Sequence, residues 1–434
     1  MPVQKVSYTT EEALAYHHGR FSGNGKIEVI PKVPYRNIKD LTLAYSPGVA
    51  EPCRAIAEDV ARQYEYTNKG NLVAIVTDGT AVLGLGDIGP AAAQPVMEGK
   101  VVLFKALAGV DAFPILLDTR DTDEIVETVK RIAPAFGGIN LEDISGPRCF
   151  DILERLDAAL DIPVFHDDQH GTAVVILAAL LNALKVVDKK IEETQIVVNG
   201  AGASAIASSE FLMNAGFKDV TLCDRKGIIY EGRAEHMNPY KEKISKVTNR
   251  QGRTGSLADA LRGADVFLGL SVADQVDREM VRSMAKDPII IAMANPVPEI
   301  PPEEALAAGA RIVATGRSDY PNQVNNVLGF PGIFRGALSA RASEINHPMM
   351  MAAARALADA VPEEEVNEEY IIASPLDPGV MPAEARAVAQ AALDTGVARV
   401  DVDPDQVAAE TTAFTEAIRR RYEQFDQYLL SRQT

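Results

Sequence analysis

The stretch that decides the fold is Gln195–Asp224, which reads QIVVNGAGASAIASSEFLMNAGFKDVTLCD. An apolar run at Ile196–Val198 predicts a strand, and a turn that contains two glycines follows it. A segment with helical spacing then leads to a second apolar run, Val220–Leu222, and to the acidic residue Asp224. Strand, glycine turn, helix, strand and acid in this order predict a βαβ unit that binds a dinucleotide.

The small residues of the turn each have a physical role in such a unit. Gly200 makes the tight turn, Gly202 lets the backbone approach a pyrophosphate, and Ala205 allows the helix to pack closely on the strand. Free N–H groups at the start of the helix face the phosphates. We therefore expect the nucleotide at Asn199, Gly200, Gly202, Ala203 and Ala205.

Asp224 and its neighbours bear on the choice between NAD and NADP. Asp224 lies where it can bind the ribose hydroxyls, and its charge would repel the 2′-phosphate of NADP. Arg225 and Lys226 could instead receive that phosphate. We expect NAD as the cofactor, with the use of NADP left open.

A second glycine motif, Gly84–Gly89, matches the fingerprint literally and follows the apolar run Leu72–Val76. Pro95 predicts that no helix of useful length follows it, and the apolar run Val101–Phe104 predicts a strand. No strand that ends in an acid lies at the required distance. We therefore expect a loop on the substrate side here, not the cofactor turn.

The composition is that of a folded protein with two substantial domains. The 434 residues are 47% apolar and 24% charged, and the formal net charge of −18 argues against nucleic acid and anionic membranes as partners. The cysteines, Cys53, Cys149 and Cys223, are odd in number and far apart, which predicts reduced, buried thiols. Because the sequence has no apolar run of membrane-spanning length and no signal-peptide core in its first seven residues, we expect a cytoplasmic protein.

The order of the predicted elements gives the fold class. Strands alternate with helices along most of the chain, which predicts an α/β fold with a parallel sheet. We expect an N-terminal α/β substrate domain over residues 1–160 and a Rossmann-type, doubly wound nucleotide-binding domain over residues 161–395. Residues 396–434 predict a C-terminal helical extension. We expect the C-terminal helices to pack back on the first domain or on a second subunit.

Three acidic residues suggest a metal site. Glu142 and Asp143 are adjacent, and Asp168 belongs to a predicted loop, Asp167–His170, between a strand and a helix. Such loops open at the carboxyl ends of strands, and carboxylates that meet there repel one another unless a cation holds them. Hard oxygen ligands favour Mg²⁺ or Mn²⁺. The alternative is a solvated acidic pair and a helix cap.

A nicotinamide cofactor and a divalent cation together restrict the chemistry. Removal of a hydride from a 2-hydroxy acid gives a 2-oxo acid, and a cation chelated by the oxo group and its carboxylate acts as a Lewis acid. If a further carboxylate lies β to the ketone, the same cation stabilises the enolate that loss of CO₂ leaves. The combination suggests an oxidative decarboxylase, which needs a base for the hydroxyl proton and an acid for the enol carbon.

Five motifs resemble, in the same order, those of the malic enzymes, above all the short bacterial and archaeal form. They are Leu43–Ala50, Thr77–Asp87, Pro95–Lys100, Ile139–Asp143 and Phe165–Ala173. The resemblance implies oxidative decarboxylation of (S)-malate to pyruvate and CO₂, with reduction of NAD or NADP and a requirement for Mg²⁺ or Mn²⁺. It also implies at least a homodimer, because chain-terminal helices build subunit contacts in this family.

The resemblance implies the two residues that move protons. Tyr45 matches the general acid that protonates the enolpyruvate carbon, and Lys100 matches the base that takes the hydroxyl proton. A lysine with the ordinary pKa of ~10.4 is a poor base at neutral pH, so burial or a nearby cation should lower the pKa of Lys100.

The resemblance also implies the residues that bind. The metal ligands of the family match Glu142, Asp143 and Asp168. Its substrate contacts match Ser46, Asn295 and Asn326, and both asparagines also match contacts to the nicotinamide.

The chain departs from the family pattern at Ala81. Large animal malic enzymes have an arginine there, two residues before the Leu-Gly-Leu-Gly stretch, and it binds the substrate carboxylate. Another cation must serve here, and we expect Arg148 or Lys105. Two other functions stay open: a malolactic-type or simple 2-hydroxy-acid dehydrogenase, and a nucleotide-sensing protein without turnover.

Overall fold

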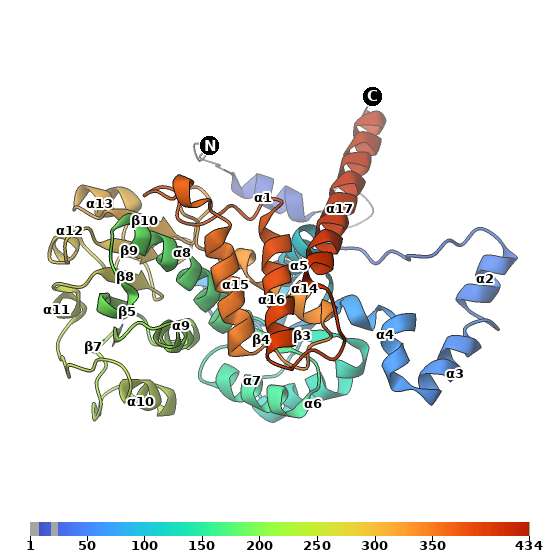
Figure 1. The fold of residues 1–434 in the computed structure, drawn as a ribbon, viewed down its shortest axis with the longest axis horizontal. Coiled ribbons are helices and arrows are strands. Elements are labelled where there is room, and N and C mark those ends of the chain that lie inside the picture. The colour runs from blue at the N-terminus through green and yellow to red at the C-terminus, as the bar shows by residue number, and fades with distance from the viewer. Residues whose placement is uncertain (1–7, 19–24, 434) are drawn as a thin grey trace.

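The structure is a computed structural model that describes residues 8–18 and 25–433. It shows an α/β protein with two sheets, covered by helices (Figure 1). The predicted fold class is confirmed. The first seven residues, on which the expectation of a cytoplasmic protein partly rests, lie outside the described residues.

The first sheet has four parallel strands in the order β2-β1-β3-β4. Its strands are β1 (Leu72–Thr77), β2 (Asp111–Leu116), β3 (Gly138–Leu141) and β4 (Val164–His166). Its helices are α5 (Gly89–Ala108), α6 (Thr122–Ile132) and α7 (Arg148–Ala159). Alternate residues of β1 face opposite sides, so Val73 and Ile75 pack with α5 while Ala74 and Val76 pack with α6 and α7. A sheet buried on both faces leaves functional groups only at the ends of its strands.

The second sheet has six strands in the order β10-β9-β8-β5-β6-β7. Its strands are β5 (Gln195–Asn199), β6 (Asp219–Asp224), β7 (Gly227–Ile228), β8 (Val266–Gly269), β9 (Ile289–Ala292) and β10 (Ile312–Thr315). Its helices are α8 (Thr172–Val186), α9 (Ala203–Asn214), α10 (Pro239–Ser245), α11 (Leu257–Leu261), α12 (Arg278–Arg282) and α13 (Pro302–Ala307). Every pair is parallel except β6 with β7. The chain winds in opposite directions from β5, and ligands bind at such a switch point.

The C-terminal helices pack back on the first domain. This was one of two predicted arrangements, the other being packing on a second subunit. These helices are α14 (Phe330–Ser339), α15 (His347–Asp359), α16 (Val380–Asp394) and α17 (Pro404–Gln433). Both α14 and α17 contact α5. The rings of Phe104 and Phe330, whose centroids are 4.7 Å apart, join α5 to α14 edge to face. This contact holds α14 against the first domain.

An N-terminal arm stands out from this body. Its helices are α2 (Ile38–Ala44), α3 (Ala50–Glu58) and α4 (Gln63–Tyr66), whereas α1 (Thr10–His17) lies over the body of the molecule in Figure 1. Neither α2 nor α3 has a buried residue, and Figure 1 shows both helices projecting away from the rest of the chain. Short 3-10 turns complete the described chain at Val60–Arg62, Asn68–Asn71, Leu83–Leu85, Ala133–Ala135, Ile191–Glu193, Asn326–Leu328 and Glu363–Glu365.

The structure corrects two predictions that concern α5. This helix runs through Pro95 without a break and includes Val101–Phe104, which was predicted to be a strand. Pro95 removes one backbone hydrogen bond near the helix start. The helix survives because Met97, Val101 and Phe104 are buried on one face at helical spacing, so tertiary packing outweighs the local cost.

The segment Asp167–His170 was predicted to be a loop, and this prediction is wrong. Together with Gly171 it forms one π-helical turn that continues directly into α8. The combined helix Asp167–Val186 is long and apolar enough to cross a membrane, but 78% of its most apolar window is buried inside the structure. Such burial is that of a core helix.

The three cysteines do not share one environment. Cys149 and Cys223 are buried, as predicted, but Cys53 is exposed on α3. The prediction of a buried thiol is wrong there because the arm has no core of its own. All three thiols are free.

Candidate active site

The acidic residues follow neighbouring strands of the first sheet. Glu142 and Asp143 come directly after β3, and Asp167 and Asp168 come directly after β4. Because β3 and β4 are parallel neighbours, their carboxyl ends meet at one edge of the sheet. The topology therefore brings together residues that are far apart in the sequence.

Three carboxylates converge at this edge. One oxygen each from Glu142, Asp143 and Asp168 lies within 4.8 Å of the others. The backbone N–H of Asp143 donates to Asp168 Oδ2 at 2.8 Å, and Asp143 has a left-handed φ of 54°. Such a backbone conformation is strained for a residue other than glycine. A set of three hard oxygen donors without histidine or cysteine fits Mg²⁺ or Mn²⁺.

Lys100 reaches the same cluster from the buried face of α5. Its Nζ forms an ion pair with Asp167 Oδ2 and a second with Glu142 Oε1 at 3.1 Å. The ammonium group also lies 4.2 Å from the centre of the Phe330 ring. Lys100 is thus held by charges on one side and by an aromatic face on the other.

Burial and mutual repulsion shift the ionisation of the cluster. Burial raises the pKa of Glu142 to about 7, of Asp167 to about 7 and of Asp168 to about 6, and the charge of Lys100 offsets only part of this effect. Burial would lower the pKa of Lys100, but the carboxylates of Asp167 and Glu142 outweigh it and raise the pKa. The expected lowering of the Lys100 pKa is therefore wrong.

The second domain contributes polar groups to this edge. Asn326 Nδ2 donates to Asp167 Oδ2 at 2.6 Å. Ser204 Oγ, at the start of α9, donates to the backbone oxygen of Asp168 at 2.6 Å. The carboxylate cluster and the start of α9 are therefore directly joined.

The glycine turn after β5 has the shape that dinucleotide binding requires. Gly200 has a φ of 135°, and a Cβ there would collide with the carbonyl oxygen of Leu270, so only glycine fits. No atom lies within 4 Å of the Cβ position of Gly202. Ala205 is buried and faces Gly200. Asn199 Nδ2 donates to Ser271 Oγ at 2.8 Å, which fixes the side chain before the turn.

Asp224 lies next to this turn, since Gly200 N–H donates to the carbonyl oxygen of Cys223 at 2.8 Å. Its carboxylate forms ion pairs with Arg233 and, at 2.7 Å, with Lys241. Burial would raise the pKa of Asp224, but these hydrogen bonds outweigh it and lower the pKa to about 2. Asp224 is therefore charged at neutral pH and already bound to two cations.

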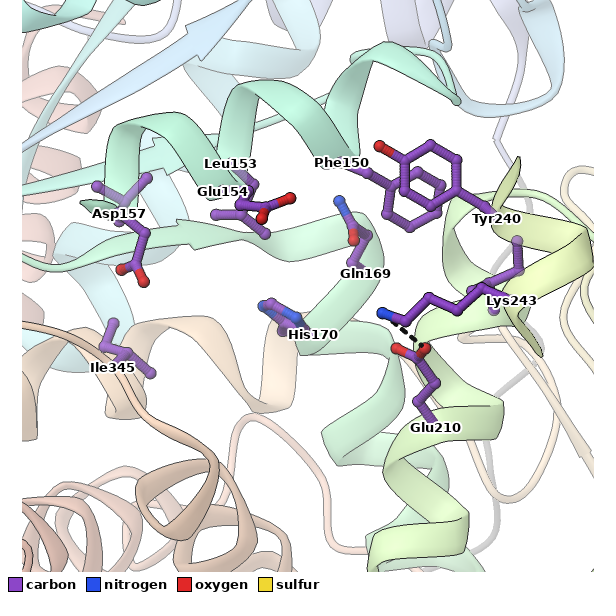
Figure 2. Close-up of a pocket in the computed structure, with 12 residues that line it drawn as sticks. Phe150, Leu153, Glu154, Asp157, Gln169, His170, Glu210, Tyr240, Lys243 and Ile345 are labelled. Carbon is purple, nitrogen blue, oxygen red and sulfur yellow. Dashed lines mark ion pairs between the residues drawn. The ribbon is translucent and has the colours of Figure 1, made fainter. Parts of the chain in front are cut away.

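A cavity of about 270 Å³ lies behind the Asp167–Gly171 turn, between α7 and the helices α9 and α10. Figure 2 shows Gln169 and His170 at this cavity, opposite the ion pair of Lys243 with Glu210. Asp168 belongs to the same turn but its carboxylate joins the cluster with Glu142. The cavity is thus a neighbour of the carboxylate cluster and shares its wall.

Comparison with known proteins identifies the family. The family model for the N-terminal domain of malic enzyme matches residues 24–157, and that for the malic enzyme NAD binding domain matches residues 169–376. The chain belongs to the malic enzyme family. A bifunctional malic/malolactic enzyme from Bacillus subtilis (strain 168) is 59% identical over 93% of this chain and 98% of its own length. An NAD-dependent malic enzyme from Geobacillus stearothermophilus is 58% identical over 92% of this chain and 82% of its own.

Solved structures of malic enzymes have the same fold. The malic enzyme from Pyrococcus horikoshii superposes with a TM-score of 0.92 at 51% identity, covering 96% of this chain and 98% of its own. That of Entamoeba histolytica gives a TM-score of 0.91 at 41% identity, covering 96% and 88%. The likeness thus extends over both domains and the C-terminal helices.

Three of the residues matched to the family lie apart from the cluster. Tyr45 and Ser46 are exposed on the arm, where α2 ends, and Tyr45 has 70% of its surface exposed. Asn295 is exposed in the loop after β9, and its backbone oxygen packs against Gly84. The Gly84 loop of the first domain thus contacts the second domain in this family fold.

The two cations expected to replace the missing arginine are both engaged. Lys105 pairs with Asp111 at 2.7 Å, at the amino end of the sheet, where Asp111 aligns with the first residue of β1. The expectation for Lys105 is wrong because the carboxylate cluster lies at the opposite end. Arg148 is near the cluster, but its guanidinium binds Asp78 at 2.7 Å and the backbone oxygen of Arg120 at 2.9 Å.

Residue patterns did not reveal several groups that contact the site. Phe330 packs on the Lys100 ammonium, and Asn140 Nδ2 donates to Glu142 Oε2 at 2.9 Å. Asn140 carries a detectable signal, a polar side chain inside a buried strand, because such groups need a partner. Arg233 and Phe330 carry none, since only folding brings them to Asp224 and Lys100.

Proposed function

We propose that this protein oxidatively decarboxylates malate to pyruvate and CO₂, with NAD or NADP as cofactor and Mg²⁺ or Mn²⁺ at the carboxylate cluster. The observation that carries the proposal is the buried Lys100 ammonium, paired with Glu142 and Asp167 beside three converging carboxylates. Membership of the malic enzyme family supports it. We also propose the division into residues 1–160, 161–395 and 396–434 as substrate domain, nucleotide domain and helical extension.

In this scheme Glu142, Asp143 and Asp168 would hold the divalent cation. When bound, the cation would supply a Lewis acid for the oxygen on the substrate C2, and the nicotinamide would supply the hydride acceptor. Asn295 and Asn326 orient substrate and nicotinamide from the second domain. The hydrogen bond from Asn326 to Asp167 supports a place for this residue at the reacting end.

Lys100 moves the proton of the substrate hydroxyl. Its Nζ takes that proton as the hydride leaves C2, and it returns a proton to the same oxygen after the C3–C4 bond breaks and CO₂ departs. Asp167 contacts Nζ and holds the lysine side chain in place beside the cluster.

Tyr45 completes the reaction in this proposal by donating its hydroxyl proton to C3 of the enolpyruvate, while Lys100 takes back the proton of the enol hydroxyl and leaves the ketone of pyruvate. Ser46 lies next to Tyr45 in the sequence. In one copy Tyr45 is exposed at the end of α2, and Figure 1 shows α2 projecting from the body of the molecule. We therefore propose a homodimer in which the arm of each copy covers the site of the other. Exposed apolar side chains on the arm favour such a contact; they are Val33, Tyr35, Ile38, Leu43 and Val60.

A malate assay with each nucleotide tests this function. We expect equal amounts of pyruvate, CO₂ and reduced nicotinamide in the presence of Mn²⁺, and no turnover after a chelator removes the metal. Activity should return when Mn²⁺ is added back. Absence of nicotinamide reduction with both NAD and NADP would contradict the proposal.

A malolactic reaction is the second candidate, because the Bacillus subtilis relative is named as a bifunctional malic/malolactic enzyme. In this reaction the reduced nicotinamide returns its hydride to pyruvate before release, so lactate and CO₂ form without net reduction. Measuring lactate and pyruvate in the same assay separates the two. Lactate as the main product would favour the malolactic reaction.

A further inference from the structure

A buried carboxylate joins the two loops that follow β8 and β9. Glu299, in the segment after Asn295, is 0% exposed. Its Oε1 accepts from the backbone N–H of Ser271 at 3.0 Å, and its Oε2 accepts from that of Ala294 at 3.0 Å. Ser271 comes after the end of β8 and Ala294 after the end of β9. One side chain therefore ties the carboxyl ends of two neighbouring strands together.

The fold makes room for this carboxylate. A Cβ on Gly269, the last residue of β8, would lie 2.4 Å from the carboxyl carbon of Glu299, so this close approach requires glycine. Burial raises the pKa of Glu299, and hydrogen bonds from Ser271 and Ala294 offset only part of that effect. A buried carboxylate without partners is costly. The acid and the two backbone N–H groups therefore depend on one another.

Each of the two loops leads to a residue at the dinucleotide site. Ser271 Oγ accepts from Asn199 Nδ2 at 2.8 Å, and Asn199 directly precedes the Gly200 turn. The other loop carries the exposed Asn295, which the proposed function places in contact with substrate and nicotinamide. Because Glu299 is itself buried, it can act on a ligand only through these neighbours.

The strand order places both loops on the nicotinamide side of the sheet. A dinucleotide crosses the sheet at the switch point, so its two halves lie on opposite sides of the strand that carries the glycine turn. Asp224 ends β6, on the side expected for the adenosine ribose, while β8 and β9 lie on the other side of β5. The loops that Glu299 joins therefore face the reacting half of the cofactor.

We propose that Glu299 is a positioning residue, whose carboxylate fixes Asn295 and the loop after β8 for contact with the nicotinamide and the substrate. The inference rests on the proposed function, because it assumes a dinucleotide on the Gly200 turn and malate beside it. A carboxylate suits this task because it accepts one N–H group on each oxygen. The amide of glutamine has the same shape but only one acceptor oxygen.

Binding of a whole cofactor and of its adenosine half tests the inference without turnover. Titration calorimetry on the full chain compares NADH with ADP, or NADPH with 2′,5′-ADP if the wild type binds that pair more tightly. In Glu299→Gln one backbone N–H faces the amide NH₂ group. We expect roughly tenfold weaker binding of the whole cofactor, less than about twofold weaker binding of the fragment, and a higher KM for malate.

The chain offers a matched control close by. Glu303→Gln makes the same change at an exposed position in the first turn of α13, and it should leave both affinities unchanged. Glu299→Asp is a second, milder variant. It keeps the charge but is one methylene shorter, so it cannot hold both loops at once. It should weaken the whole cofactor selectively even if Glu299→Gln disturbs folding.

Several outcomes would overturn the inference. Equal losses for the cofactor and its fragment in both variants would show a general structural role, and an unchanged cofactor affinity would show no role. If Glu299→Gln binds the cofactor and oxidises malate as the wild type does, this inference fails and the proposed function stands. If the wild type binds neither NADH nor NADPH, the dinucleotide site itself is wrong and both proposals fail.

Discussion

The ionisation of Lys100 depends on the carboxylates around it. Burial alone would lower its pKa, but Asp167 and Glu142 lie close enough to raise it. The same contacts hold the ammonium group in one position beneath the cluster. A residue proposed as a base is therefore kept protonated until the charge balance around it changes.

Replacement of Lys100 by alanine should remove this proton transfer. We expect kcat of malate oxidation to fall by about 10²–10⁴, measured at saturating malate, nucleotide and Mn²⁺. Lys105→Ala is the matched control, because Lys105 lies on the same helix but pairs with Asp111 at the other end of the sheet. A Lys100→Ala enzyme with near wild-type kcat would remove Lys100 from the mechanism.

Asp168 should be needed for metal binding itself. Asp168→Asn removes one of three converging charges, and we expect the affinity for Mn²⁺ to fall by at least about tenfold to a hundredfold. Calorimetry or electron paramagnetic resonance of the free ion measures this without substrate. Asp157→Asn, on the exposed side of α7, is the control. Unchanged Mn²⁺ affinity in Asp168→Asn would contradict a metal site at the cluster.

At the scale of elements, the pairing of α14 with α16 encloses a carboxyl group. Glu384 on α16 is fully buried, and among the described residues neither of its oxygens has a hydrogen-bond partner. Gly332 on α14 makes room for it, since a Cβ there would collide with Glu384 Oε2. Burial raises the pKa of Glu384 well above its ordinary value, so the folded protein binds this proton more tightly than the unfolded chain does.

Glu384 should therefore make stability depend on pH. A raised pKa in the folded state contributes stability that is fully present below the unfolded value of ~4.3 and is lost as pH rises toward the folded value. We expect Glu384→Gln to flatten the fall in unfolding free energy between pH 5 and pH 7, by at most about 1.4 kcal/mol per pH unit. Chemical denaturation at several pH values measures it.

The control for this experiment is Glu364→Gln, which removes an exposed carboxylate from a surface turn. It should leave the slope of stability against pH unchanged. If Glu384→Gln shows the same slope as the wild type, the side chain is ionised or hydrated in the folded protein.

At the scale of the whole molecule, the arm and the carboxylate cluster belong to different parts of one chain. The cluster is complete within one copy, whereas Tyr45 is exposed on helices that bury nothing. The proposed function needs Tyr45 beside the cluster. In the proposed closed dimer, each arm brings its Tyr45 to the cluster of the other copy.

Mixing two inactive variants tests this arrangement. Tyr45→Phe and Lys100→Ala homodimers should both be impaired in pyruvate formation. After dissociation and reassociation of an equal mixture, half of the dimers are mixed and each carries one intact site. About a quarter of wild-type activity should therefore return if Tyr45 acts on the partner's site. No recovery in dimers shown to be mixed, or a monomer in sedimentation, would contradict the arrangement.

The sequence by itself determined the fold class, the dinucleotide turn and the five family motifs, because these depend on local order along the chain. Strand periodicity, the spacing of Gly200 from Asp224 and the Glu142–Asp143 pair are all readable within a few tens of residues. The prediction that Pro95 prevents a helix is wrong, because burial of one face of α5, which is a tertiary effect, outweighs the local cost of the proline.

Only the tertiary structure decided what surrounds each of these groups. Lys100 forms its ion pairs with residues from other elements, and Asp224 pairs with Arg233 and Lys241. Glu384 is buried by helices that pack on it from elsewhere in the fold. The local order of residues does not encode these contacts. Charge and pKa are set by such neighbours and by solvent exclusion, and both depend on distance in space. The sequence therefore fixes which chemical groups are present, and the fold fixes their charge and their partners.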